Sequence, residues 1–464
     1  MNCDHDTIAA PATAAGGAIA LIRISGSEAL AVCDRIFRGR QPLADADGYT
    51  VHYGRIMDAE RILDDVLITV FRAPHSYTGE DAAEISCHGS QYIVAETLRL
   101  LTAAGARMAR PGEFTIRAYL AGKLDLSQAE AVADIIASSS RAAHALAANQ
   151  MRGGYSEALE ALREKLLHLT SLLELELDFS EEDVEFADRT QLRDTMQQIE
   201  TRIDALRSSF SLGNALKEGI AVAIAGAPNV GKSTLLNRLL NEERAMVSEI
   251  AGTTRDVIEE RLNIDGVVFR FLDTAGIRTT DDRLEQMGIQ RTMSSISRAQ
   301  IVIYMADAAQ FRTADKGVPQ DSLLSEIPVP APGFTVRNDQ TLLTVINKTD
   351  TVPNLQLPAG TIGISARSGE GIDCLRKILR DTVDTQALYH GDTVVSNSRH
   401  YEALTAAGNA LRTALDGLHD QLPADLLSEE IREVVRHLGT ITGRGTIAPD
   451  EVLRNIFSKF CIGK

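Results

Sequence analysis

The residues from Gly226 to Thr234, GAPNVGKST, have the spacing G-x-x-x-x-G-K-[S/T] of a phosphate-binding loop. An apolar run, Ile220 to Ala225, precedes them, and leucines at helical spacing follow. We therefore expect the loop between a buried strand and a helix N-terminus, where backbone N–H groups and the helix dipole attract phosphate. In such loops the lysine reaches the β- and γ-phosphates and the following hydroxyl holds Mg2+. The predicted nucleotide contacts here are Asn229, Val230, Gly231, Lys232, Ser233 and Thr234, with Ser233 as a metal ligand.

Four further short motifs follow in the order that a GTPase needs. Gly252 to Asp256 (GTTRD) offers Thr254 as a second Mg2+ ligand. The motif DTAG closes the apolar run from Val267 to Leu272, which places its aspartate beside the metal and its last amide near the γ-phosphate. The contacts predicted from this motif are Asp273, Thr274, Ala275 and Gly276.

The last two motifs concern the nucleotide base. Asn347-Lys348-Thr349-Asp350 follows the strand-like run from Leu342 to Ile346. A carboxylate such as Asp350 can accept from both N1–H and N2–H of guanine, which adenine lacks. Ser365, Ala366 and Arg367 can cover the edge of the base. Five such motifs, each at a strand end, predict a GTP site.

Ras-like proteins carry a water-orienting glutamine after the motif DTAG, but this chain has Ile277 there. Another polar side chain must orient the water, or hydrolysis is slow. The candidates nearby are Arg278, Asp281, Asp282 and Glu285, and we interpret the two aspartates as solvated loop charges.

The composition is that of a globular protein of several domains. At 464 residues we expect two to four domains, and 44% hydrophobic with 24% charged residues is ordinary. No apolar run reaches the roughly 18 residues of a membrane span, and no signal peptide is expected. The five cysteines are scattered, which is typical of a reducing cytoplasm. The net charge of −17 argues against a nonspecific nucleic-acid binder but leaves local contact with tRNA open.

Leucines at spacings of three and four predict helices on both sides of the nucleotide segment. The stripes are Leu159, Leu162, Leu166, Leu169 and Leu173, then Met196, Ile199, Ile203 and Leu206, then Leu404, Leu411, Leu415 and Leu418, and finally Ile431, Val434, Val435 and Leu438. We interpret them as the core of one helical domain, into which the nucleotide domain is inserted. The N-terminal part reads as mixed α/β, with strands at 17–26, 64–71 and 82–87.

These motifs together resemble one family. GAPNVGKS with GTTRD looks like the TrmE–Era–EngA group of GTPases, and the C-terminal sequence FSKFCIGK is similar to the MnmE (TrmE) family of tRNA-modification GTPases. In that family a potassium ion replaces an arginine finger. The resemblance implies K+ ligands at Asn229, Ser248, Ile250 and Thr253 within a loop that also holds Ala251, Gly252 and Thr254, and it implies Glu285 as the water-orienting catalytic residue.

The resemblance also extends to both ends of the chain. It implies an N-terminal domain that binds 5,10-methylene-tetrahydrofolate and forms a homodimer, with folate contacts at Arg23, Glu80, Lys123 and, more weakly, Lys464. It further implies a functional thiol at Cys461. The family often has Arg-Gly-Gly before the first long strand, where this chain has Ala15-Gly16-Gly17, so one basic contact is in doubt.

We therefore expect a multidomain α/β and α protein. Its segments are an N-terminal folate-binding-like α/β domain (1–124), a discontinuous helical domain (125–215 and 386–464) and an inserted Ras-like doubly wound GTPase domain (216–385). The resemblance implies a cytoplasmic, potassium-dependent GTPase that uses GTP, Mg2+, K+ and a folate one-carbon unit. Its partner would be an FAD-containing MnmG/GidA-type protein, with which it would add an aminomethyl or carboxymethylaminomethyl group at C5 of the wobble uridine of tRNA.

Two alternatives stay open. An Era/EngA-like ribosome-assembly switch would carry a KH-like RNA module after the GTPase domain, with a Gly-x-x-Gly loop. The segment TGRG, from Thr442 to Gly445, does not meet that pattern, and residues 386–464 look helical. A folate enzyme that its GTPase domain only regulates is the third reading, and it merges with the first.

Overall fold

The computed structural model describes residues 6–14, 16–178, 189–244, 260–272, 294–311, 337, 340–353, 355–383, 393–444, 450–458, 460 and 463. The chain forms two compact units, each built from separate stretches of sequence. The first comprises Met1–Ile136, Gln150–Ile203 and Glu402–Lys464, and the second Ala137–Asn149 and Asp204–Tyr401. The expected division into four segments at 124, 215 and 385 remains a prediction.

The N-terminal part of the first unit is a seven-stranded sheet in the order β3-β4-β5-β6-β2-β1-β7. Its pairs are antiparallel except for β1 with β7. Alternate residues of β5 are buried, because successive side chains of a strand point to opposite faces. The buried side chains pack against helices α1 and α2. The bounds are β1 Ile8–Pro11, β2 Ile19–Ser25, α1 Ala29–Ile36, β3 Phe37–Gly39, β4 Thr50–Asp58, β5 Arg61–Phe71, β6 Ala82–His88, α2 Gln91–Ala103, β7 Arg107–Met108 and α3 Glu113–Leu120.

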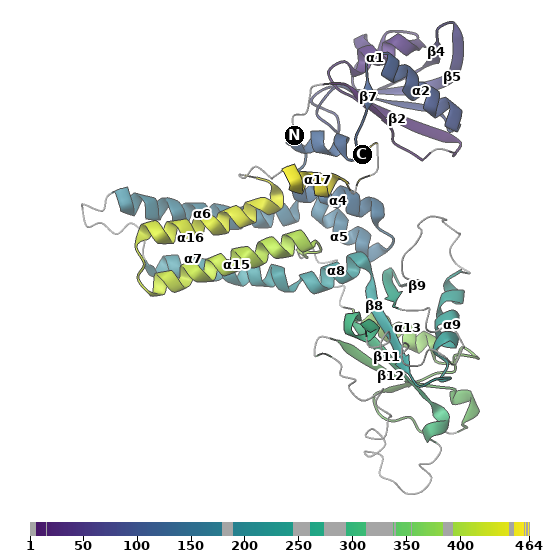
Figure 1. The fold of residues 1–464 in the computed structure, drawn as a ribbon, viewed down its shortest axis with the longest axis vertical. Helices are drawn as coiled ribbons and strands as arrows, with labels where there is room; N and C mark the ends of the chain where they lie inside the picture. The colour runs from purple at the N-terminus through teal and green to yellow at the C-terminus, as the bar shows by residue number, and fades with distance from the viewer. Residues whose placement is uncertain are drawn as a thin grey trace. The chain divides into compact units, whose positions relative to one another are not determined.

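Long helices form the rest of the first unit, and the leucine stripes lie in their core. In α6 all five leucines of the predicted stripe are buried, and α6 packs along α16 (Figure 1). The predictions of helices and of a bundle core are therefore confirmed for this stripe. The helix bounds are α4 Leu126–Ala137, α6 Gly154–Asp178, α7 Arg189–Ser208, α15 Ser398–His419, α16 Ala424–Thr442 and α17 Asp450–Ser458, while α5 Arg141–Met151 belongs mostly to the second unit.

The end of the chain is anchored rather than free. Ile456 and Phe457 of α17, together with Phe460, are buried against Ile116 of α3 and Leu126 of α4. We expected these apolar residues to hold the tail, because a terminus becomes ordered only when it is tied down. From residue 393 to 463, the described residues contain helices and no strand.

The second unit is built on a six-stranded sheet in the order β13-β12-β11-β8-β10-β9, parallel except for the β9–β10 pair. Side chains of β8 alternate between two cores: Val222 packs with the helices α8, α9 and α13, and Ala223 packs with residues 296–304 on the other face. Burial on both faces explains the continuous apolar run. The bounds are α8 Phe210–Glu218, β8 Ile220–Gly226, α9 Lys232–Arg244, β9 Glu260–Ile264, β10 Val267–Phe271, β11 Ile301–Asp307, β12 Thr341–Asn347, β13 Thr361–Gly363 and α13 Ile372–Asp381.

The strands predicted around the motifs agree with the structure to within a few residues. The predicted run 220–225 is β8, 267–272 is β10, 342–346 is β12 and 361–364 is β13. Among the described residues, no helix is both long and apolar enough to cross a lipid bilayer.

Candidate nucleotide-binding site

The predicted phosphate loop connects the end of β8 to the start of α9, as expected. Two of its glycines are required by close contacts. A Cβ at Gly226 would lie 2.4 Å from the carbonyl oxygen of Met305, and one at Gly231 would lie 2.3 Å from Nδ2 of Asn347. Both glycines also have positive φ, at 146° and 101°. The loop backbone can therefore approach a ligand closely, which suits a phosphate at the N-terminus of α9.

Lys232 is folded back over this loop. Its Nζ donates to the carbonyl oxygens of Gly226 and Ala227, each at 2.9 Å. Burial lowers the pKa of Lys232, because a desolvated ammonium is less stable when charged. Phosphate oxygens in the loop would offset that desolvation. Ser233 lies next to it in the first turn of α9 and is half-buried.

Asn347 connects the phosphate loop to the segment that we expect beside the base. It ends β12 with 2% of its surface exposed. Its Nδ2 donates to the Val230 carbonyl at 2.7 Å, and its Oδ1 accepts from the Ala366 N–H at 2.9 Å. One amide side chain therefore satisfies a buried acceptor in one loop and a buried donor in another, which fixes the distance between the two loops.

Lys348 makes a second connection to the phosphate loop. Its Nζ donates to the Asn229 carbonyl at 2.9 Å and pairs with Asp307 at 2.7 Å. Asp307 ends β11 and is the register partner of Asn347 on β12. Burial raises the pKa of Asp307, but hydrogen bonds from Lys348 and from a backbone N–H outweigh it and the pKa is lowered. Sequence reasoning missed Asp307, although an acidic residue at the end of an apolar run was a visible signal.

The other residues predicted to contact the base also follow the C-terminal ends of β12 and β13, as predicted. Asp350 is exposed in a short 3-10 helix, Thr349–Thr351, directly after Lys348. Ser365 is buried and its Oγ accepts from the Ser368 N–H at 3.2 Å, which closes a turn around exposed Arg367. The structure thus brings three of the five motifs to one edge of the sheet.

The other two motifs and several predicted residues lie outside the described residues. These are Ser248, Ile250, Ala251, Gly252, Thr253, Thr254, Asp273, Thr274, Ala275, Gly276, Glu285, Cys461 and Lys464. Their predicted roles remain predictions.

Three of the four predicted folate contacts, Arg23, Glu80 and Lys123, are described and belong to the first unit. Arg23 on β2 pairs with Glu84, its register partner on β6, at 2.7 Å, and its guanidinium lies 5.6 Å from the centroid of the Tyr77 ring. Arg23 Nη1 also donates to the Gly463 carbonyl at 3.3 Å. The C-terminal tail therefore reaches this site, although Gly463 and Arg23 are far apart in sequence.

Glu80, in the loop before β6, contacts the face of β2 that carries Arg23. Ser25, two residues after Arg23 on β2, donates from Oγ to Oε2 of Glu80 at 2.8 Å. Lys123 is exposed, and its Cε would lie 3.6 Å from a Cβ at Gly79. The structure therefore gathers Arg23, Glu80 and Lys123 in one neighbourhood, as a single ligand would need. Sequence reasoning missed Arg117, which holds Glu80, because nothing around that residue marks it.

Comparisons with known proteins agree with the sequence analysis. A family model described as the MnmE helical domain matches residues 126–461, and one described as the GTP-binding protein TrmE N-terminus matches residues 7–123. A protein called tRNA modification GTPase MnmE from Bacteroides thetaiotaomicron is 48% identical and covers 99% of this chain and 100% of its own length. Its namesake from Cytophaga hutchinsonii is 49% identical, covering 99% of this chain and 98% of its own length.

A solved structure of Era in complex with MgGDPNP and a segment of 16S ribosomal RNA is 28% identical and covers 41% of this chain and 65% of its own. Its TM-score against this chain is 0.25, and the family assignment does not depend on it. By contrast, the family models and the full-length relatives include the regions on both sides of the nucleotide sheet. The chain therefore belongs to the MnmE (TrmE) family of tRNA modification GTPases.

Proposed function

We propose that this protein hydrolyses GTP to drive modification of the wobble uridine of tRNA. The observation that carries the proposal is the pair of connections through Asn347 and Lys348, which join the phosphate loop to the base-side motif in one rigid edge. The full-length relatives named tRNA modification GTPase MnmE support the tRNA part. The reaction would add an aminomethyl or carboxymethylaminomethyl group at C5.

In the nucleotide site, Lys232 neutralises the β- and γ-phosphates, and the amides of the loop cradle them. The hydroxyl of Ser233 and, from the switch segments, Thr254 and Asp273 would hold Mg2+, which supplies charge neutralisation when bound. Asp350 accepts hydrogen bonds from the guanine edge. Glu285 orients the attacking water in place of the missing glutamine.

Potassium takes the place of an arginine finger in this proposal. Asn229 supports it, because the residue is exposed at the phosphate loop with φ at 61° and has its carbonyl fixed by Lys348. Its amide oxygen has no hydrogen bond among the described residues and would serve as an oxygen ligand for a monovalent cation, with further ligands from Ser248, Ile250 and Thr253. A cation held there would supply positive charge where negative charge grows at the β–γ bridge.

The first unit would bind the folate. Arg23 and Lys123 suit the carboxylates of a folate tail, and Glu80 suits the pterin N–H donors. Gly463, beside Arg23, carries the tail to this site, which supports a role for Cys461 in the modification and for Lys464 in folate binding. The protein would work in the cytoplasm as a homodimer with an FAD-containing MnmG/GidA-type partner.

The experiment that tests the hydrolytic mechanism compares GTP turnover in matched potassium and sodium buffers. The informative variant is Asn229→Gly, which removes the amide without straining a residue at positive φ. Potassium should stimulate the wild type strongly and the variant weakly. The control Asn263→Ala, near the end of β9, should respond like the wild type. Equal rates in both salts would overturn the potassium mechanism and leave the GTP site standing.

A second experiment tests the modification itself. Cys461→Ser should abolish tRNA modification in the presence of the partner protein and should leave GTP turnover unchanged. Modification at the wild-type rate would show that this thiol has no part in the reaction.

A further inference from the structure

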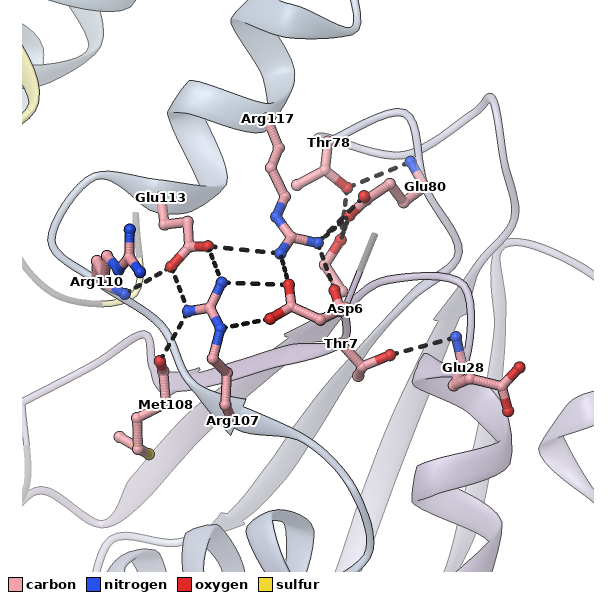
Figure 2. A network of polar contacts seen from close by, with 11 residues as sticks. Asp6, Thr7, Glu28, Thr78, Glu80, Arg107, Met108, Arg110, Glu113 and Arg117 are labelled. Atoms are coloured by element: carbon pink, nitrogen blue, oxygen red, sulfur yellow. Dashed lines mark hydrogen bonds and ion pairs between the residues drawn. The ribbon is translucent and has the colours of Figure 1, made fainter. Parts of the chain in front are cut away.

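A partly buried ion network includes Glu80 (Figure 2). It consists of three carboxylates, Asp6, Glu80 and Glu113, and two arginines, Arg107 and Arg117. The members come from the segment just before β1, the loop before β6, β7 and α3, so that four separate stretches of chain meet there.

Asp6 and Glu113 each pair with both arginines of the network. Asp6 accepts from both arginines, with its Oδ1 3.2 Å from Nη2 of Arg107 and 2.7 Å from Nη2 of Arg117. Glu113 likewise contacts both, and its Oε2 accepts from Nη1 of Arg107 at 2.8 Å and from the Arg110 N–H at 2.8 Å. Each of these carboxylates therefore has two cations.

Glu80 is paired differently, because Arg117 is its one cationic partner within the described network. Nη1 of Arg117 lies 3.1 Å from Oε1 and 3.0 Å from Oε2 of Glu80, and it also donates to the Asp6 carbonyl at 2.8 Å. Three carboxylates face two guanidiniums, so the network has one excess negative charge. Glu80 is the carboxylate with the fewest cationic partners in it.

Arg117 is well placed to fix the direction of this carboxylate. Its side chain is 3% exposed, whereas that of Glu80 is 27% exposed. Burial lowers the pKa of Arg117, but the hydrogen bonds and charges of Glu80 and Asp6 outweigh it, and the pKa is raised. The guanidinium therefore stays charged behind Glu80. Among the described contacts, Oε2 of Glu80 accepts from Arg117 and from Ser25, whereas Oε1 accepts from Arg117 alone and so keeps acceptor capacity.

We propose that Arg117 is a positioning residue, which holds Glu80 so that its carboxylate, chiefly through Oε1, accepts an N–H donor from the pterin ring. This inference rests on the proposed folate function. A pterin presents an amino group beside a ring N–H, and a carboxylate fixed in one orientation can accept from this donor edge. The net negative charge of the network attracts such donors.

The same network supplies a matched control. Arg107 is an arginine of the same cluster, and it contacts Asp6 and Glu113 without contacting Glu80 among the described contacts. Arg107→Met and Arg117→Met remove the same charge and the same hydrogen-bonding group. A purely structural role predicts that both variants lower the melting temperature and that neither changes ligand affinity selectively.

The test measures tetrahydrofolate binding to the full-length protein by calorimetry, with thermal melting of each variant. Glu80→Gln should weaken binding by about tenfold to a hundredfold, as expected for the loss of charge-assisted hydrogen bonds. Arg117→Met should weaken it by a similar factor, and Arg107→Met by less than about threefold. The double variant Glu80→Gln with Arg117→Met should bind no worse than Glu80→Gln alone, because both changes remove one interaction.

Other outcomes distinguish failure of the positioning role from failure of the folate site. If the wild type binds and Glu80→Gln weakens binding while Arg117→Met leaves it intact, the positioning role is wrong and the folate site stands. Additive losses in the double variant would also overturn it. If the wild type does not bind tetrahydrofolate, the proposed folate function fails and the inference fails with it. Should Arg117→Met not fold, Arg117→Lys retains the charge without the planar fork and should still weaken binding severalfold.

Discussion

The connection made by Asn347 gives a prediction whose size follows from the structure. Asn347→Ala leaves the Val230 carbonyl without its donor and the Ala366 N–H without its acceptor, and both groups are buried. An unsatisfied buried polar group costs about 1–3 kcal/mol. Two such groups give a loss of about 2–6 kcal/mol in the free energy of unfolding of the second unit. At about 2–4 °C per kcal/mol for a unit of this size, the melting temperature should fall by about 4–24 °C.

The assay is thermal unfolding of the full-length protein with and without GDP, because the transition that GDP raises belongs to the unit that binds it. The matched control is Asn263→Ala, which removes a contact from Asn263 Oδ1 to the Gly266 N–H in a partly exposed turn. We expect Asn263→Ala to lower the free energy of unfolding by less than about 1 kcal/mol. GDP affinity should fall at least about tenfold in Asn347→Ala, since the loops lose their fixed spacing.

The reasoning would be refuted if Asn347→Ala melted within about 2 °C of Asn263→Ala, a difference of about 0.5–1 kcal/mol for a unit of this size. Unchanged GDP affinity together with a large stability loss would have a narrower meaning. It would show that the connection stabilises the unit without setting the geometry of the nucleotide site.

Three further predictions concern specificity, hydrolysis and acid stability. Asp350→Asn should shift preference from guanine toward xanthine nucleotides, and competition binding with GDP and XDP tests this. Glu285→Ala should slow hydrolysis strongly with GTP affinity nearly intact; a large affinity loss would make the residue structural. Burial raises the pKa of Asp6 and Glu113, but pairing with arginine outweighs it and both pKa values lie below the ordinary 3.8 and 4.5. The stabilisation from these two carboxylates is therefore complete above those ordinary pKa values and is lost as the pH falls through the lowered ones. Between about pH 5 and 3, the melting temperature should therefore fall more steeply in the wild type than in Arg107→Met.

Much of the nucleotide site was predictable because its determinants are local. The spacing from Gly226 to Thr234 fixes a turn, a helix start and a lysine within nine residues. The apolar runs before Asn347 and Ser365 indicate strands, and parallel strands bring their C-terminal ends to one edge of a sheet. The leucine stripe of α6 was equally visible, since helical periodicity reports which face is buried.

The contacts that hold these motifs together were not predictable in the same way. Asp307 and Lys348 meet because β11 and β12 are neighbours in the sheet, which their sequences do not specify. The same holds for Asn347 and Val230, which are 117 positions apart. Polar pairs of this kind have no period and no fixed spacing.

The polar site of the first unit shows the division most clearly. Propensity and hydrophobic pattern act over short stretches, so the sequence alone predicts a strand with Arg23, a polar loop with Glu80 and an apolar C-terminal tail. The contact of Arg117 with Glu80 across 37 positions, and that of Gly463 with Arg23 across 440, arise from tertiary packing and have no local signal. Burial of the surrounding apolar faces brings these segments together, and the charged groups then find partners because an unpaired charge at low exposure costs several kcal/mol, about 3–5 when one partner is removed.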